Sequence, residues 1–206
     1  MRKVLRSPLI WFFLTLLFIL FLTFLGPAEK SLGGHVRVVY LHGAWVWAAL
    51  AAFVAAGLLG LAALLFRRPP LYAWSCALGR TGLIFWITYL PLSLWAMQAN
   101  WNGLFLAEPR WRLALAFAAG GLLLQIGLAL AEKPAWTALA NLFFCIVLLY
   151  AVTGVQNIMH PGSPIFSSEA LLIQVYFISL FLLVLLAAFW AAFWFKTRFC
   201  SLKPGS

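Results

Sequence analysis

The sequence predicts an all-α fold: one domain, residues 1–206, built as an integral membrane bundle of six transmembrane helices with both termini cytoplasmic. Of its 206 residues 66% are hydrophobic and 9% are charged, against about 45–50% and about 25% in a typical soluble domain. This composition excludes a soluble globular protein. Six charge-free stretches are also long enough to cross a bilayer as helices. They are 8–26, 40–66, 81–99, 113–131, 135–156 and 170–195.

The first stretch has features of a cleaved signal peptide. It follows Arg2, Lys3 and Arg6 and ends near the small residues of 26–28, as a secretory signal does. Its apolar run, 9–25, is longer than a usual signal core of about 7–15 residues. We therefore expect a retained first helix.

Short turns and the distribution of Lys and Arg predict how the remaining stretches pack and which way they face. The turns RRPP and EKP are short, so we expect stretches two and three, and four and five, to pack as antiparallel hairpins. Outside the stretches, ten Lys and Arg residues lie on the side of the two termini and four on the other side. Because cytoplasmic segments carry the excess, we expect loops 27–39, 100–112 and 157–169 to face outward from the plasma (inner) membrane. The +10 net charge then reflects topology, and no nucleic-acid partner is indicated.

The three cysteines are far apart in the sequence. Cys76, Cys145 and Cys200 form neither a CxxC pair nor an even set, so we expect no disulfide or zinc framework. Cys145 is expected to pack within its helix. Cys76 and Cys200 are expected to be free thiols, because they lie on the predicted inner side, where the compartment is reducing.

All three histidines fall on the predicted outer side. His42 lies just inside the start of the second stretch, where unpaired amides and the positive end of the helix favour a neutral imidazole. Trp45, three residues on, shares its helix face. His160 precedes the stiff turn Pro-Gly-Ser-Pro, and His35 follows two glycines in a more exposed stretch. Taken alone, a histidine at the end of a stretch is more often an interfacial residue than a ligand.

Two neutral histidines across an apolar, Trp-rich surface suit haem iron with axial nitrogen ligands. Trp95 and Trp101 flank outer ends of the stretches, although an interfacial aromatic belt explains any single Trp. The outward-facing arginines are suited to bind the two haem propionates as bidentate partners, or they only mark loop boundaries. They are Arg37, Arg110 and Arg112.

The run VRVVYLHGAW, residues 36–45, resembles the second-helix signature of the haem-handling membrane proteins of cytochrome c maturation, the CcmC and CcsA type. His160-Pro-Gly-Ser is similar to the outer-loop histidine segment of that family. The resemblance implies a non-covalent, b-type haem with His42 and His160 as its axial ligands. The ring would lie against Trp45, Trp95 and Trp101, with Arg37 and Arg110 at the propionates. It further implies a haem chaperone or apocytochrome c and exporter-like membrane subunits as partners, and delivery of haem rather than catalysis.

The chain departs from this family in the loop between the third and fourth stretches. Residues 95–115 keep Trp95, Trp101 and Gly103, and an acidic residue followed by Pro and Arg at 108–110, but lack a dense Trp cluster. Glu108 stands where the family has Asp, and Gly43 stands near the place of a common proline. We interpret the chain as a divergent or shortened member.

Three other functions stay open from the sequence. A small bis-histidine membrane cytochrome would use the same ligands, but no inner histidine exists for a second haem in a path across the membrane. A solute transporter commonly needs ionisable groups inside its spans, and here the stretches offer only neutral groups such as Gln125, Asn141 and Gln174. A structural membrane subunit, with its outer histidines and tryptophans as interface residues, is the third.

Overall fold

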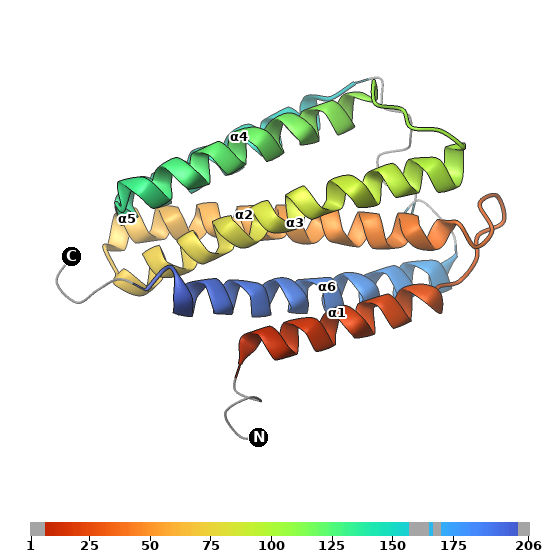
Figure 1. Ribbon diagram of the computed structural model, residues 1–206, viewed down its shortest axis with the longest axis horizontal. Helices are drawn as coiled ribbons and strands as arrows, with labels where there is room; N and C mark the ends of the chain where they lie inside the picture. The colour runs from red at the N-terminus through yellow and green to blue at the C-terminus, as the bar shows by residue number, and fades with distance from the viewer. Residues whose placement is uncertain (1–6, 157–164, 167–169, 202–206) are drawn as a thin grey trace.

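The computed structural model describes residues 7–156, 165–166 and 170–201. The described chain contains six α-helices that run in alternating directions (Figure 1). They are α1 (Pro8–Phe24), α2 (Val36–Phe66), α3 (Pro69–Trp101), α4 (Pro109–Ala131), α5 (Pro134–Gly154) and α6 (Leu171–Arg198). Within these residues, α2 to α6 are long and apolar enough to cross a membrane, and α1 is a shorter apolar helix of 17 residues. The predicted all-α, six-helix membrane architecture is confirmed in these terms.

Proline and short turns define the helix ends. A proline, which suits the first helical turn because its missing N–H is not needed there, begins α1, α3, α4 and α5. Only Arg67 and Arg68 separate α2 from α3, and only Glu132 and Lys133 separate α4 from α5. The helices of each pair pack against each other, so both predicted hairpins are confirmed.

Several helices extend beyond the predicted stretches, and α2 and α3 become the longest of the six. α2 begins at Val36 rather than at 40, and α3 begins at Pro69 rather than at 81. At 31 and 33 residues they are each about 45–50 Å long, against about 30 Å of hydrocarbon. The predicted loop 67–80 is therefore helical from Pro69, and Arg80 lies inside α3. The predicted stretch begins after Arg80 because the charge interrupts the apolar run. The helix itself continues through this arginine, since a long arginine side chain can reach the interface.

The alternating helices give the bundle two distinct ends. The "loop end" has the ends of α1, α3 and α5 and the starts of α2, α4 and α6, and the "termini end" has the opposite helix ends (Figure 1). At the loop end, Glu29 and Gly33 exchange backbone hydrogen bonds of 3.2 and 2.7 Å. Hydrogen bonds from the Ser31 side chain and the Leu32 and Ser31 amides lower the pKa of Glu29. The α1–α2 loop is therefore held in a tight turn there.

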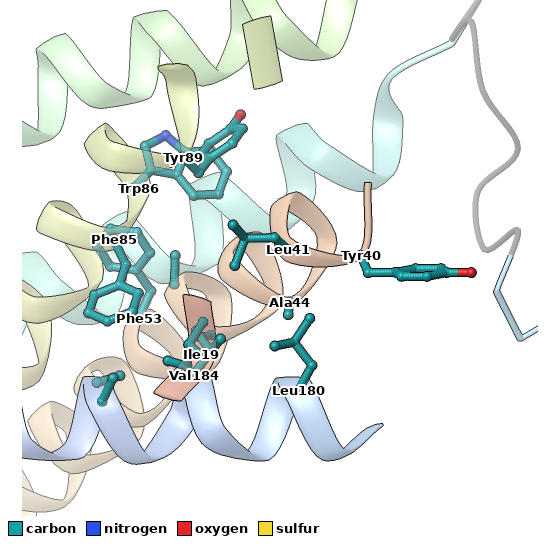
Figure 2. Close-up of a cluster of buried hydrophobic side chains, with 14 of the residues drawn as sticks. Ile19, Tyr40, Leu41, Ala44, Phe53, Phe85, Trp86, Tyr89, Leu180 and Val184 are labelled. Atoms are coloured by element: carbon teal, nitrogen blue, oxygen red, sulfur yellow. The ribbon is translucent and has the colours of Figure 1, made fainter. Parts of the chain in front are cut away.

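α2 is the central helix, in contact with α1, α3, α5 and α6. Large side chains of α2 and α3, including Phe53, Phe85 and Trp86, fill the space between them (Figure 2). Against α5, α2 instead presents glycine. A Cβ atom at Gly60 would lie 2.6 Å from the Ala138 carbonyl oxygen, and one at Gly57 would lie 3.0 Å from Cys145 Cβ. This close approach is typical of membrane helices, which associate through small residues.

A buried amide links four helices near this contact. Asn141 of α5 donates to the carbonyl and hydroxyl oxygens of Ser75 at 2.9 and 3.1 Å and accepts from Gln125 of α4 at 3.1 Å. Ser75 of α3 donates to the Ala56 carbonyl of α2 at 2.8 Å. The neutral polar groups Gln125 and Asn141 are thus structural, because each buried polar atom needs a partner in lipid.

The cysteine prediction is wrong for two of the three residues. Cys76, near the start of α3, forms a disulfide with Cys200, which follows α6, and their Cα atoms are 6.0 Å apart. The pairing is possible because α3 starts and α6 ends at the same end of the bundle, which a separation of 124 residues conceals. Cys145 is a buried free cysteine, as expected.

Candidate functional site

A cavity of about 640 Å³ opens in the half of the bundle nearest the loop end. Its walls come from the first half of α2, the second half of α3, the start of α4 and the end of α5, and are completed by Leu32, Ile165, Phe166 and Phe177. The volume is within the range of about 300–1,000 Å³ usual for sites that bind small molecules and cofactors. This cavity is the candidate site.

Aromatic side chains form much of the cavity wall. Trp86 and Tyr89 of α3 lie together (Figure 2) and meet edge to face with ring centroids 5.0 Å apart. Both border the cavity. The Trp86 indole N–H donates to the Ala114 carbonyl of α4 at 3.0 Å, which fixes the ring and joins α3 to α4. Trp47, Trp101 and Trp111 also line the cavity. A wall of flat rings suits a flat, apolar ligand.

His42 borders the cavity, with its ring centroid 5.5 Å from that of Tyr89. It lies in the second turn of α2, because the helix begins at Val36. The prediction that unpaired first-turn amides act on His42 is therefore wrong, since the effect of the helix end fades within one turn. His35, the residue just before α2, is exposed and does not line the cavity. His42 is thus the described histidine at this site.

The predicted tryptophans divide between the cavity and other positions. Trp101 lines the cavity. Trp45 stacks on Phe85 at 4.7 Å and donates to the Thr88 hydroxyl at 2.9 Å, away from the cavity lining. Trp95 is 54% exposed and also lies outside the lining. The sequence argument did not single out Trp86, although its place in the middle of α3, far from both interfaces, argues against an aromatic-belt role.

Of the three predicted arginines, one reaches the cavity. Arg110 lines it, and its buried Nε has no hydrogen-bond partner among the described residues. Arg37 donates from Nε to the Gly26 carbonyl at 2.8 Å, and Arg112 donates from Nε to the Leu106 carbonyl at 3.2 Å. Neither of these two lines the cavity. Arg110 is therefore the cation available to an anionic ligand group.

Glu108 shares the polar edge of the cavity with Arg110 and is only 5% exposed. Its Oε2 accepts from the Trp111 amide at 2.6 Å and so caps the start of α4. Its buried Oε1, like the indole nitrogen of Trp111, has no hydrogen-bond partner in the part of the chain that the structure describes. Buried polar atoms of this kind usually have a partner, which a ligand could supply.

The predicted second ligand, His160, lies outside the described residues. The chain on either side of its segment borders the cavity: Val152 and Thr153 of α5 come before it, and Ile165 and Phe166 follow. Among the described residues, no group of three or more His, Cys, Asp or Glu side chains could hold a metal ion.

The described cavity residues fit haem in three respects. Flat rings match the macrocycle, the His42 imidazole matches an axial ligand, and the unpartnered Nε of Arg110 matches a carboxylate. The Glu108 carboxylate does not suit the propionate edge of haem, because two anionic groups repel each other. It is the one group in the described lining that favours a different ligand.

The fold defines a multi-pass membrane protein with an aromatic cavity at one end. Comparisons with protein-family models, curated proteins and solved structures found no match for this chain.

Proposed function

We propose that this membrane protein binds haem at the outer face of the membrane and hands it on for cytochrome c assembly. The observation that carries the proposal is the position of His42 in an aromatic cavity whose polar edge contains Arg110. The resemblance of residues 36–45 to haem-handling proteins supports the same ligand. The distribution of Lys and Arg supports an outward-facing loop end.

Each cavity residue has a distinct task in this proposal. His42 would supply one nitrogen ligand to the iron, and His160, in the predicted outer loop, would supply a second. Trp86 and Trp101 provide apolar surface for the macrocycle, and Arg110 pairs with a propionate. When bound, haem supplies an iron centre that accepts two nitrogen ligands. Because the cavity lies at the loop end, the bound haem would be accessible to an external haem chaperone or apocytochrome c and to exporter-like partner subunits.

The Arg110→Ala variant tests the propionate contact. We expect it to weaken haem binding about tenfold or more, because a hydrogen bond to a charged group contributes about 1.5–3 kcal/mol. The measurement is a haem titration of the purified protein followed by the Soret band. Arg112→Ala is the matched control, since Arg112 is exposed and outside the cavity. A haem whose propionates are esterified should bind the wild type and Arg110→Ala equally. Equal weakening by both arginine variants would contradict the assignment.

A retained electron-transfer haem is distinguished from a delivered one by its release. Haem-loaded protein is mixed with excess apomyoglobin, and transfer is followed by the change in the Soret band. We expect transfer within minutes, because the cavity lies at an end of the bundle. Retention of haem over hours would favour a membrane cytochrome.

A second candidate is a binder or transporter of a cationic solute. The observation that favours it is Glu108, a buried carboxylate that lines the same cavity as Trp101 and Trp111, since carboxylates and aromatic faces both attract organic cations. Quenching of tryptophan fluorescence by tetramethylammonium, without a Soret band on addition of haem, would support this candidate over the first.

A further inference from the structure

The disulfide at the termini end conflicts with the orientation that the charges predict. Arg67 and Arg68, Lys133, Lys196 and Arg198 all lie at this end, which the positive-inside rule assigns to the cytoplasm. Disulfides are rare in the cytoplasm, and those found there are usually transient, catalytic or redox-sensing. A pair of cysteines in bonding distance on this side is therefore more than a structural cross-link.

The surroundings of the pair are electropositive. Lys196 Nζ lies 4.5 Å from the centroid of the Trp74 ring, at the junction of α6 with α3. Trp74 is two residues before Cys76 and so faces another side of α3, whereas Arg80 is four residues after Cys76, on the same side. Reactive cysteines lie in electropositive, partly exposed environments of this kind, whereas inert ones are buried in apolar surroundings.

The two cysteines differ in access. Cys76 is partly exposed and Cys200 is only 5% exposed. Cys200 is also anchored, since its amide donates to the Phe195 carbonyl at 3.1 Å. An external reagent therefore reaches Cys76 first, and Cys200 is placed as the resolving residue.

We propose that Cys76 and Cys200 form a thiol–disulfide exchange site on the cytoplasmic side, whose reactant is a low-molecular-weight couple of the glutathione type. In the oxidising direction, the Cys76 thiolate attacks glutathione disulfide, forms a Cys76–glutathione mixed disulfide and releases one glutathione thiolate. The Cys200 thiolate then attacks Cys76 Sγ, forms the intrachain disulfide and releases the second glutathione thiolate. Two electrons pass to glutathione disulfide, and the two protons of the cysteine thiols end on the released glutathiones.

A redox titration tests the exchange. The full-length protein in lipid nanodiscs, with Cys145→Ala to leave only two thiols, is equilibrated with glutathione mixtures, quenched with acid and labelled with a polyethylene-glycol maleimide. We expect the labelled fraction to rise from about 10% to about 90% over a roughly hundredfold change in [GSH]²/[GSSG], as a two-electron couple requires. With glutathione disulfide, Cys200→Ser should form a mixed disulfide on Cys76 faster than Cys76→Ser does on Cys200.

Two outcomes would overturn the proposal. One is a pair that stays oxidised in every mixture, as a permanent cross-link would, or stays reduced in every mixture. The other comes from membrane vesicles treated with a reductant and then with an impermeant maleimide. We expect labelling in inside-out vesicles, and labelling only in right-side-out vesicles would place the pair in an oxidising compartment. The redox titration does not use haem, and the pair lies at the opposite end of the bundle from the cavity, so its failure would leave haem binding untouched. The vesicle labelling also tests the orientation that the proposed function assumes, whereas the haem titration fails or succeeds in either orientation.

Discussion

Replacing Ala96 by tryptophan is expected to lower haem affinity by about a hundredfold or more, equivalent to about 2.7 kcal/mol. Ala96 lines the cavity from α3. A tryptophan side chain there would occupy the space that the macrocycle needs, beside rings that already border it. The loss would be steric, because no ligand or charged group is removed. The measurement is the dissociation constant from a haem titration at the Soret band.

The matched control for this substitution is Ala99→Trp. Ala99 lies one turn further along α3 and is also half-buried, but it does not line the cavity. It should keep the wild-type affinity. Size-exclusion elution and the far-ultraviolet circular dichroism of both variants should match the wild type. Full haem affinity in a well-folded Ala96→Trp protein would mean that haem binds elsewhere.

The Gly60→Ala substitution is expected to destabilise the bundle by about 2–3 kcal/mol, the usual scale for overpacking. The added Cβ would lie 2.6 Å from the Ala138 carbonyl oxygen and 3.1 Å from the Ser75 hydroxyl. A backbone oxygen cannot rotate away, so α2 and α5 must separate. This separation would also strain the hydrogen bonds that Ser75 makes to α2 and α5.

Gly127→Ala is the control, and the expected sign is opposite. Gly127 lies inside α4, and a Cβ there would meet nothing within 4 Å among the described residues. Alanine should therefore stabilise the helix by up to about 1 kcal/mol through its higher propensity. The free energies of unfolding come from denaturation in mixed micelles followed by circular dichroism. If Gly60→Ala were as stable as Gly127→Ala, the close α2–α5 contact would be wrong.

Helix number was predictable from the sequence, and helix length was not. A segment in lipid must satisfy its own backbone, so each apolar run predicts a helix, and α2 to α6 follow this rule. Arg80 shows the limit of this rule. Its charge ends the apolar run, but the backbone hydrogen bonds of α3 continue through it. The Cys76–Cys200 pair was missed because sequence spacing does not report which helix ends meet.

The site was predictable to the level of the bundle end. Of the residues that the sequence assigns to haem, His42, Trp101 and Arg110 line the cavity, whereas Trp45 and Arg37 make other contacts. The position of a residue along a helix tells which end of the bundle it occupies. Because α2 is in contact with four other helices, apolar periodicity does not tell which of them a given side chain meets. For the same reason Trp86, which comes from the middle of α3, was found only from the structure.

The central claim is the proposal that His42 and His160 bind haem. The most direct measurement is the absorption spectrum of the protein purified in mild detergent, oxidised and reduced, beside His42→Ala, His160→Ala and His35→Ala. We predict a Soret band that moves on reduction, is diminished or shifted in the first two variants, and is unchanged in His35→Ala, because His35 is exposed and outside the cavity. A wild type that contains no haem and takes up none when it is supplied would contradict the account.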